Sequence, residues 1–159
     1  CYKKTLLIHA SDLPKGRGWS PHVWDIINGS DKITLSLLKA EDKIDSGEVY
    51  KKTHINIENH ELWNEINHKL FSAEIFLMDF AVKSFHNLSG ISQSKDQDVS
   101  IYSKRTPSDS IIDPDLSIRD QFNKIRVMDP VRYPAFFELI FSILFIISKS
   151  VIFLYLIIY

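Results

Sequence analysis

The residues in this sequence that are best suited to proton chemistry are a histidine and an aspartate about 36 positions apart. His9 ends a short apolar run, and Asp45 lies in an Asp-Ser-Gly turn. An imidazole titrates near neutral pH, and a carboxylate beside it stabilises its protonated form. Such a pair can donate a hydrogen bond to a developing oxyanion and help to remove a proton from a nucleophile. His9 and Asp45 are therefore the candidate catalytic residues.

A strand followed by a loop is expected to position His9. Residues 5–8 are apolar and partly β-branched, which is typical of a buried strand that presents a polar residue at its end. Residues 10–19 include two glycines and a proline, so they predict a binding loop. Ser20 as an N-cap and Pro21 in the first turn then predict a short helix over residues 21–28.

Two further strands and a long helix follow. Apolar residues alternate with polar ones over residues 33–37, and another strand is expected near residues 48–52, after a charged turn. Apolar residues at three- and four-residue steps predict an amphipathic helix over residues 60–85, covering one face of the sheet. This order of elements is typical of the α/β class, in which function gathers beyond the strand ends.

The second half has weaker patterns. Residues 87–98 are polar and aperiodic, so they predict a loop or a boundary. Ser117 and Asp120 resemble a helix cap, and Ile118, Phe122 and Ile125 would form one face of a helix that ends before Pro130.

Composition excludes some classes of function. The 159 residues carry 25% charged and 45% hydrophobic side chains and a net charge of −1, which gives no reason to expect DNA binding. Cys1 is the single cysteine, so an intramolecular disulfide and a cysteine-based zinc site are excluded. The histidines show no ligand-like grouping, and no metal site is expected. We expect a cytoplasmic protein.

Both ends of the sequence are unusual. The sequence does not begin with Met and has no targeting signal, so we expect it to begin within a longer protein. Residues 139–159 are almost wholly apolar and approach the ~20 residues that span a bilayer, although Lys149 interrupts them. A membrane-associated protein and a shifted reading frame are the two interpretations of this tail, and we favour the second.

The motif around the two candidate residues resembles the signature of the formyltransferase family. That signature has a histidine at a strand end, a Ser-x-Leu-Pro loop, a short helix ending in Asn-Gly, and an Asp-x-Gly turn. The following residues match it in type and spacing: His9, Ser11, Leu13, Pro14, Arg17, Gly18, Pro21, Trp24, Asn28, Gly29, Asp45 and Gly47.

The resemblance implies a Rossmann-like sheet and transfer of a formyl group from 10-formyltetrahydrofolate to a primary amine. His9 would donate to the tetrahedral oxyanion, and Asp45 would keep His9 charged and relay the amine proton through water. The turn over residues 41–47 would hold the pterin ring through backbone groups. The residues expected to bind the folate are Ser11, Leu13, Pro14, Asp42, Ile44 and Gly47.

One departure from the family pattern bears on activity. The family generally has an asparagine two residues before the histidine, where this sequence has Leu7. Leucine cannot donate to an oxyanion, and loss of one such donor typically lowers the rate about 10²–10³-fold. Either Ser11 or a main-chain amide substitutes, or this copy is slow.

The second half resembles the sugar branch of the family. The segments 105–110, 121–126 and 133–137 are similar to nucleotide-sugar formyltransferases that act on 4-amino sugars. The acceptor is therefore expected to be a nucleotide-linked 4-amino sugar, and a homodimer is left open. A methionyl-tRNA formyltransferase-like enzyme and a non-catalytic binding module are the alternatives. Candidate acceptor-binding residues are Lys15, Arg17, Trp19, Arg105 and Arg126.

These patterns divide the chain into three parts. Residues 1–90 are expected to form an α/β Rossmann-like formyltransferase core that is incomplete at its N-terminus. Residues 91–137 would form a linker and the start of a C-terminal subdomain. Residues 138–159 would form the apolar tail.

Overall fold

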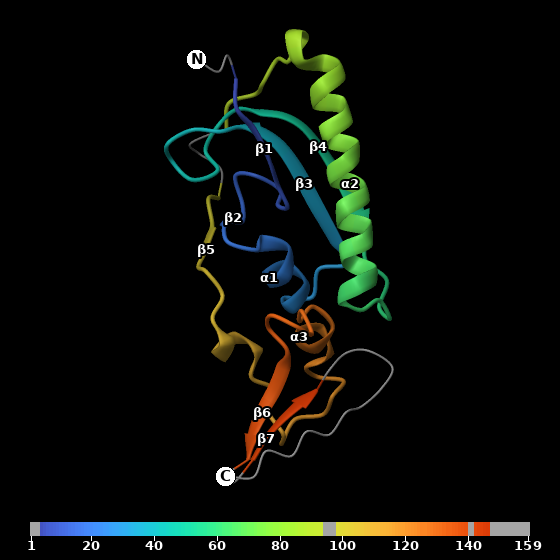
Figure 1. The fold of residues 1–159 in the computed structure, drawn as a ribbon. Coiled ribbons are helices and arrows are strands. Elements are labelled where there is room, and N and C mark those ends of the chain that lie inside the picture. The colour runs from blue at the N-terminus through green and yellow to red at the C-terminus, as the bar shows by residue number, and fades with distance from the viewer. Residues whose placement is uncertain (1–3, 94–97, 140–141, 147–159) are drawn as a thin grey trace.

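The computed structural model describes residues 4–93, 98–139 and 142–146 and shows an α/β architecture (Figure 1). The central sheet has the strand order β1-β3-β4. These strands span Leu6–His9, Lys32–Lys39 and Val49–Asn56. Both pairings in this sheet are antiparallel, so the parallel crossovers of a Rossmann-like sheet are not seen among the described residues.

The middle strand, β3, is covered on both faces. Ile33, Leu35 and Leu37 are buried on one face, as the alternation predicts. Ser36 is also fully buried, because the loop after β1 covers the other face and the Ser36 hydroxyl donates to the Ser11 carbonyl (2.7 Å). The register pairs His9 with Ser36, which places the end of β1 beside the middle of β3.

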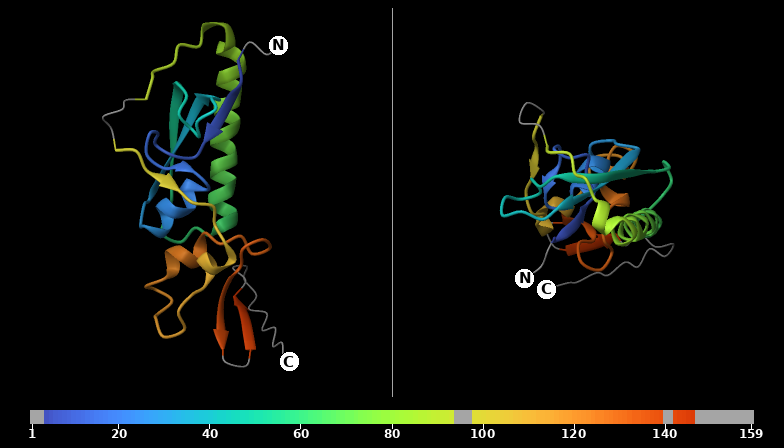
Figure 2. Two further views of the ribbon diagram at one scale, coloured as in Figure 1. Left: turned by 90° about the vertical axis from the view of Figure 1, so that its left-hand side faces the viewer. Right: turned by 90° about the horizontal axis from the view of Figure 1, so that it is seen from above.

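Helix α2, Trp63–Ser84, lies along one side of the sheet, and Figure 2 shows this from two directions. Its start is later than predicted, because the carboxylate of Glu65 accepts the Leu62 amide (2.8 Å) and so caps the first turn. The helix buries one stripe at three- and four-residue steps: Ile66, Leu70, Ala73, Leu77 and Ala81. The predicted amphipathic helix is confirmed.

The short helix after the loop is also confirmed, with one correction. Helix α1, Pro21–Ile27, begins with the proline in its first turn, and Val23 and Ile26 pack into the core. Ser20, however, has a left-handed backbone (φ 47°), and its side chain makes no capping hydrogen bond. The side-chain N-cap predicted at Ser20 is therefore wrong.

The second predicted helix is shorter than expected. Helix α3 spans only Phe122–Arg126, because Ser117 and Asp120 close a separate turn, in which their side chains hydrogen-bond at 2.7 Å. Ile118 is 65% exposed and does not belong to an apolar helix face. Short 3₁₀ turns span Phe85–Asn87 and Pro107–Ser110.

Two minor sheets complete the described structure. Strands β2, Arg17–Gly18, and β5, Ile101–Tyr102, pair in parallel and fix the loop after β1. Strands β6, Ala135–Leu139, and β7, Ser142–Ile146, form an antiparallel hairpin at the far end of the molecule (Figure 1). The start of the apolar tail is thus β-structure, and residues 147–159 lie outside the described part. No helix in the described ranges has the length and apolar character needed to cross a bilayer.

Candidate active site

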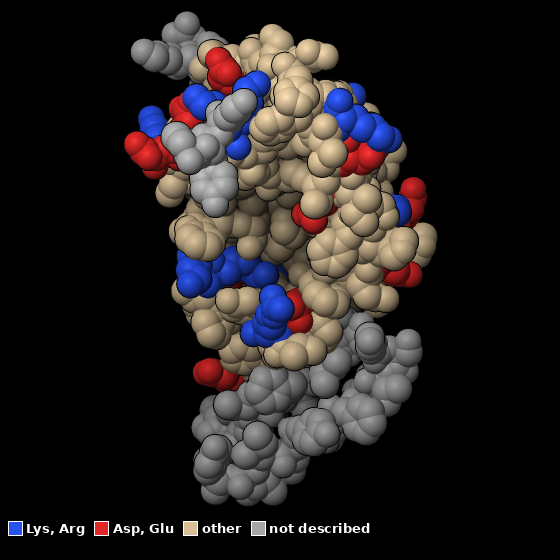
Figure 3. Space-filling view, turned by 45° about the horizontal axis from the view of Figure 1, so that its top comes forward, with Lys and Arg blue, Asp and Glu red and all other residues tan. Residues whose placement is uncertain are grey.

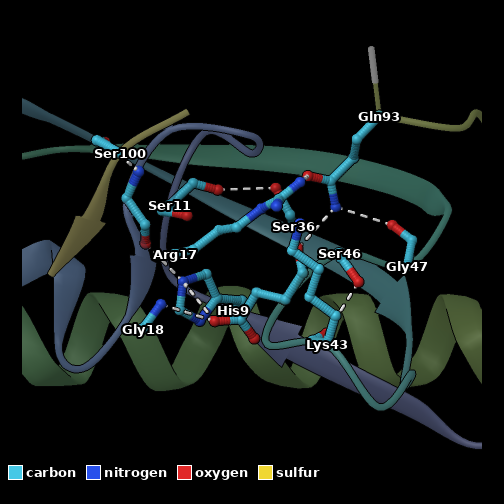
Figure 4. A network of polar contacts seen from close by, with 12 residues as sticks. His9, Ser11, Arg17, Gly18, Ser36, Lys43, Ser46, Gly47, Gln93 and Ser100 are labelled. Atoms are coloured by element: carbon cyan, nitrogen blue, oxygen red, sulfur yellow. Dashed lines mark hydrogen bonds and ion pairs between the residues drawn. The ribbon is translucent and has the colours of Figure 1, made fainter. Parts of the chain in front are cut away.

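His9 ends β1 (Figure 4), and the side chain of Asp45 lies against it. Nε2 of His9 lies 3.6 Å from Oδ2 of Asp45, and the two side chains are only 10% and 12% exposed. The same Nε2 donates to the Gly16 carbonyl (2.7 Å), because a carbonyl oxygen can only accept. The imidazole is therefore fixed between the Gly16 carbonyl, in the loop after β1, and the Asp45 carboxylate, in agreement with the pairing expected from the sequence.

The backbone of the Asp45 turn sets the direction of its carboxylate. Asp45 has a left-handed conformation (φ 48°), which aspartate tolerates better than most residues. Its Oδ2 accepts the backbone amide of Gly18 (2.8 Å), so one main-chain donor of the loop holds the carboxylate near His9. Among the described residues, Oδ1 of Asp45 has no protein partner and remains able to accept a hydrogen bond.

Two glycines allow this assembly to close. Gly18 has φ 94°, and a Cβ there would lie 2.4 Å from the Tyr102 carbonyl of β5. A Cβ on Gly47 would lie 1.9 Å from the carbonyl of Lys39. Neither contact is sterically allowed, so glycine is required at both positions for the loop and the turn to approach their neighbours.

Gln93 holds the Asp45 turn from outside, and the sequence did not reveal this role. Its side-chain amide donates to the carbonyls of Asp45 and Gly47, both at 2.8 Å. Its Oε1 accepts Nη2 of Arg17 (2.5 Å). Gln93 lies in the aperiodic polar segment, where no spacing or motif distinguishes it, so its position became evident only from the fold.

The predicted binding residues separate into three cavities. Ser11 and Lys15 line a cavity of about 630 Å³, together with Tyr102. Leu13 lines a second one of about 430 Å³, and Arg105 a third of about 540 Å³. The face drawn in Figure 3 is hollowed near its centre, and basic side chains gather below the hollow.

The remaining candidates differ in exposure. Lys15 is an exposed loop cation whose side chain is 63% accessible, whereas Arg17 is only 6% exposed and is committed to Gln93. Arg126 is 3% exposed, donates to the Glu58 carbonyl (2.8 Å) and does not line the cavity of Arg105. In the turn, Asp42 and Ile44 point to solvent.

Exposure also distinguishes the two tryptophans near the loop. Trp19 is 54% exposed and has the Lys104 ammonium 5.5 Å from its ring centroid, so its face is accessible to a ligand. Trp24 stacks on Tyr102 (6.0 Å between centroids) and packs within the protein. Leu7 pairs with Leu38 in the sheet, and its apolar side chain supplies no hydrogen-bond donor to the site. The hydroxyl of Ser11 is buried and has no hydrogen-bond partner within the described part of the chain, so it can donate to a ligand near the loop.

Two titratable groups near the site have unusual environments. Burial, and then the nearby charges of Arg105 and His9, lower the pKa of His22 to about 4, so its imidazole is neutral at pH 7. Burial raises the pKa of Asp25, and the hydrogen bond from the Tyr102 hydroxyl (2.9 Å) opposes this shift. No group of three or more His, Cys, Asp or Glu residues able to hold a metal occurs in the described ranges.

Comparison with known proteins gives consistent matches, although no family model matches the chain. The bifunctional polymyxin resistance protein ArnA of Wigglesworthia glossinidia brevipalpis is 31% identical over 144 residues, which is 90% of this chain and 22% of ArnA. A methionyl-tRNA formyltransferase of Prochlorococcus marinus is 35% identical over 100 residues, which is 61% of this chain and 28% of the relative. The chain thus spans about a quarter of the length of these relatives.

Solved structures of similar fold include the methionyl-tRNA formyltransferase of Clostridium thermocellum (TM-score 0.79, 23% identity, 98% of this chain and 69% of that one). HypX of Aquifex aeolicus in complex with tetrahydrofolic acid has a TM-score of 0.77 at 17% identity, covering 91% of this chain and 25% of HypX. A 4-N formyltransferase of Francisella tularensis has a TM-score of 0.69 at 20% identity, covering 84% and 57%. The chain therefore has the fold of these formyltransferases, and its sequence is similar to ArnA and to a methionyl-tRNA formyltransferase over 90% and 61% of its length.

Proposed function

We propose that this chain contributes the catalytic groups for transfer of a formyl group from 10-formyltetrahydrofolate to a primary amine. The observation that carries the proposal is the contact between His9 and Asp45, 3.6 Å apart and mostly buried at the end of β1. Attack of an amine on a formamide creates a negatively charged tetrahedral centre and a positively charged nitrogen. A hydrogen-bond donor and a proton acceptor must therefore lie close together, as these two residues do.

The roles follow from the contacts of each side chain. His9 carries its proton on Nε2 and donates it to the Gly16 carbonyl. During the reaction the same N–H group would instead donate to the oxyanion. Asp45 uses Oδ2 for the Gly18 amide, which leaves Oδ1 to accept the amine proton through a water molecule. The leaving tetrahydrofolate nitrogen then takes up a proton from the same pair.

The folate is expected to lie against the turn over residues 41–47. HypX, which has this fold, has been solved with tetrahydrofolic acid. The turn presents the 57% exposed side chain of Ile44 to solvent, which is suited to packing against a flat ring. The carbonyls of Asp45 and Gly47 already accept hydrogen bonds from Gln93. Gln93 would therefore hold the shape of the turn and would not contact the ligand.

For the acceptor we propose a nucleotide-linked 4-amino sugar. The likeness to the 4-N formyltransferase of Francisella tularensis and to ArnA supports this class. The methionyl-tRNA formyltransferases among the relatives support a tRNA-linked amine as the second candidate. A cytoplasmic location, a homodimer and the division at residues 90 and 137 stay predictions.

A non-catalytic binding module is a further candidate, because Leu7 stands where the family has asparagine. Leu7 follows the alternation of β1 and lies on the same side of the strand as His9. The position near the histidine therefore offers an apolar side chain instead of an amide donor. Such a module would bind folate without transferring the formyl group.

The test is a formyl-transfer assay with 10-formyltetrahydrofolate and a panel of nucleotide-linked 4-amino sugars. We expect measurable transfer by the chain and a loss of about 10²–10³-fold in kcat for His9→Ala, with little change in KM. His68→Ala is the matched control, since His68 is exposed on α2. Equal rates for His9→Ala and the unchanged chain would contradict the assigned site.

The same assay separates the candidates. Transfer only to methionyl-tRNA would replace the sugar acceptor by the tRNA-linked one. Binding of tetrahydrofolate without transfer to any amine would leave the binding module as the function of this chain.

A further inference from the structure

The segment of residues 100–102 holds the loop after β1, although Ser100 lies 84 positions after Gly16 in the chain. Its strand, β5, has only two residues and pairs in parallel with Arg17–Gly18. A ladder of this length supplies few main-chain hydrogen bonds, so the side chains of the segment contribute much of its attachment. In Figure 4 the backbone of the loop lies between the labelled Ser100 and His9.

The peptide group between Gly16 and Arg17 is hydrogen-bonded on both sides. Its carbonyl, on Gly16, accepts Nε2 of His9 (2.7 Å), and its N–H, on Arg17, donates to the Ser100 carbonyl (2.9 Å). The amide of Gly16 donates to Oγ of the same serine (2.8 Å). Hydrogen bonds in such a chain polarise and strengthen one another. Ser100 therefore fixes the peptide group that sets the direction of the His9 imidazole.

The main-chain donor that holds Asp45 belongs to the same ladder. The amide of Gly18 donates to Oδ2 of Asp45 (2.8 Å), and the next amide, that of Trp19, donates to the Tyr102 carbonyl (3.2 Å). Gly18 is also the residue that pairs with Tyr102 in the register of the two strands. A displacement of Tyr102 would therefore move the amide that orients the Asp45 carboxylate.

The side chain of Tyr102 attaches β5 to helix α1. Its hydroxyl donates to Oδ1 of Asp25 (2.9 Å), and its ring stacks on that of Trp24, with 6.0 Å between centroids and 19° between planes. Both partners lie on α1, which packs into the core through Val23 and Ile26. The position of β5 relative to the core is therefore fixed by this one side chain and its two partners on the helix.

We propose that Ser100 and Tyr102 are positioning residues for formyl transfer, which orient His9 and Asp45 through the main chain of residues 16–19. The inference rests on the proposed function and names further residues on which the same site depends. The two residues act through geometry: they align the imidazole N–H with the oxyanion and the carboxylate with the amine. Misplacement of a reacting group by about 1 Å can lower a rate about 10²-fold, so a small displacement of β5 is sufficient.

The first test is steady-state kinetics of formyl transfer. Ser100→Ala removes the acceptor of the Gly16 amide, and Tyr102→Phe removes the hydrogen bond to Asp25 but keeps the ring on Trp24. In each variant we expect kcat to fall about tenfold and KM to stay nearly unchanged. Ser100→Thr keeps a hydroxyl at this position and should restore kcat.

The second test needs no substrate and follows the side-chain ¹H–¹⁵N NMR signals of His9 in the 159-residue chain, assigned with His9→Ala. We expect the Nε2 signal to shift in Ser100→Ala and Tyr102→Phe and to return in Ser100→Thr. Tyr50→Phe and Ser103→Ala are the matched controls, because these hydroxyls make no hydrogen bond within the described part of the chain. Neither control should move the signal, since a contact that only stabilises the fold does not reorient His9.

The NMR result decides whether the two residues position the site. An unchanged Nε2 signal in Ser100→Ala and Tyr102→Phe, with folding verified by near-UV circular dichroism, would overturn the proposal, even if kcat fell. An unchanged kcat in both variants of an active chain would also overturn it. If the signal shifts but no version of the chain transfers a formyl group, the proposed function fails and the positioning of His9 by β5 stands.

Discussion

At the scale of single residues, the chain keeps one histidine ready for hydrogen bonding and another one neutral. His9 is fixed by the Gly16 carbonyl and lies beside Asp45, whereas burial keeps the imidazole of His22 neutral at pH 7. Sequence alone predicted the first from its motif. It did not predict the second, because the environment of His22 depends on Arg105, which is remote in sequence.

His22 makes the stability of the fold depend on pH. Its pKa is depressed from 6.5 to about 4, so below pH 6.5 the unfolded chain binds a proton that the folded chain does not. The contribution is therefore fully present above pH 6.5 and is lost as the pH falls towards 4, by about 3 kcal/mol in total. Urea unfolding from pH 7 to pH 4 measures this loss.

The control for this effect is a variant that cannot titrate at the same place. His22→Gln should make the free energy of unfolding fall less steeply over that pH range. His60→Gln, at an exposed position, should leave the slope unchanged. Parallel pH curves for His22→Gln and the unchanged chain would contradict the assignment.

At the scale of elements, the strands and helices differ in how far local pattern determines them. The alternation of Ile33, Leu35 and Leu37 predicted β3, and the helical periodicity predicted α2. Both predictions were possible because the buried residues of each element recur at one regular spacing. The start of α3 was not predictable, since Ser117 and Asp120 close a turn of their own instead of capping a helix.

Helix α2 provides a direct test of which of its faces stabilises the fold. Leu77 is fully buried under the sheet, and Leu77→Ala should lower the free energy of unfolding by about 2–5 kcal/mol. Ile75 is 66% exposed on the same helix, and Ile75→Ala should change it by less than about 1 kcal/mol. Denaturant unfolding of both variants decides, and a larger loss for Ile75→Ala would mean that the assigned core face is wrong.

At the scale of the whole molecule, the site is assembled from segments that are distant in sequence. The motif positions of His9, Asp45 and Gly47 could be read from spacing, because each lies in a short local pattern. The hydrogen bonds that connect these segments could not be predicted from spacing. Gln93 joins the Arg17 loop to the Asp45 turn from a stretch with no periodicity. Likewise, the separation of the basic candidates into different cavities depends on the packing of the C-terminal segment.

Removal of the Gln93 side chain should loosen the Asp45 turn without unfolding the protein. In Gln93→Ala the carbonyls of Asp45 and Gly47 lose their donor, so we expect backbone amides of residues 43–47 to exchange with solvent at least tenfold faster. Hydrogen exchange followed by mass spectrometry measures this.

Gln121 offers a matched control, since its side chain bridges the backbone amide and carbonyl of Asp113 in a similar way. Gln121→Ala should speed exchange around residues 113–116 and leave residues 43–47 unchanged. Similar exchange of the Asp45 turn in the two variants would show that Gln93 does not restrain it.

The distance in sequence between Gln93 and the turn also orders events during synthesis on the ribosome. The 48 positions between Asp45 and Gln93 take roughly 2–10 s to translate at about 5–20 residues per second. During that interval the nascent chain already contains His9, the glycine loop and the Asp45 turn, but not the amide that holds the turn. The histidine and the carboxylate can therefore meet early, while their final geometry is set only when the chain has grown past residue 93.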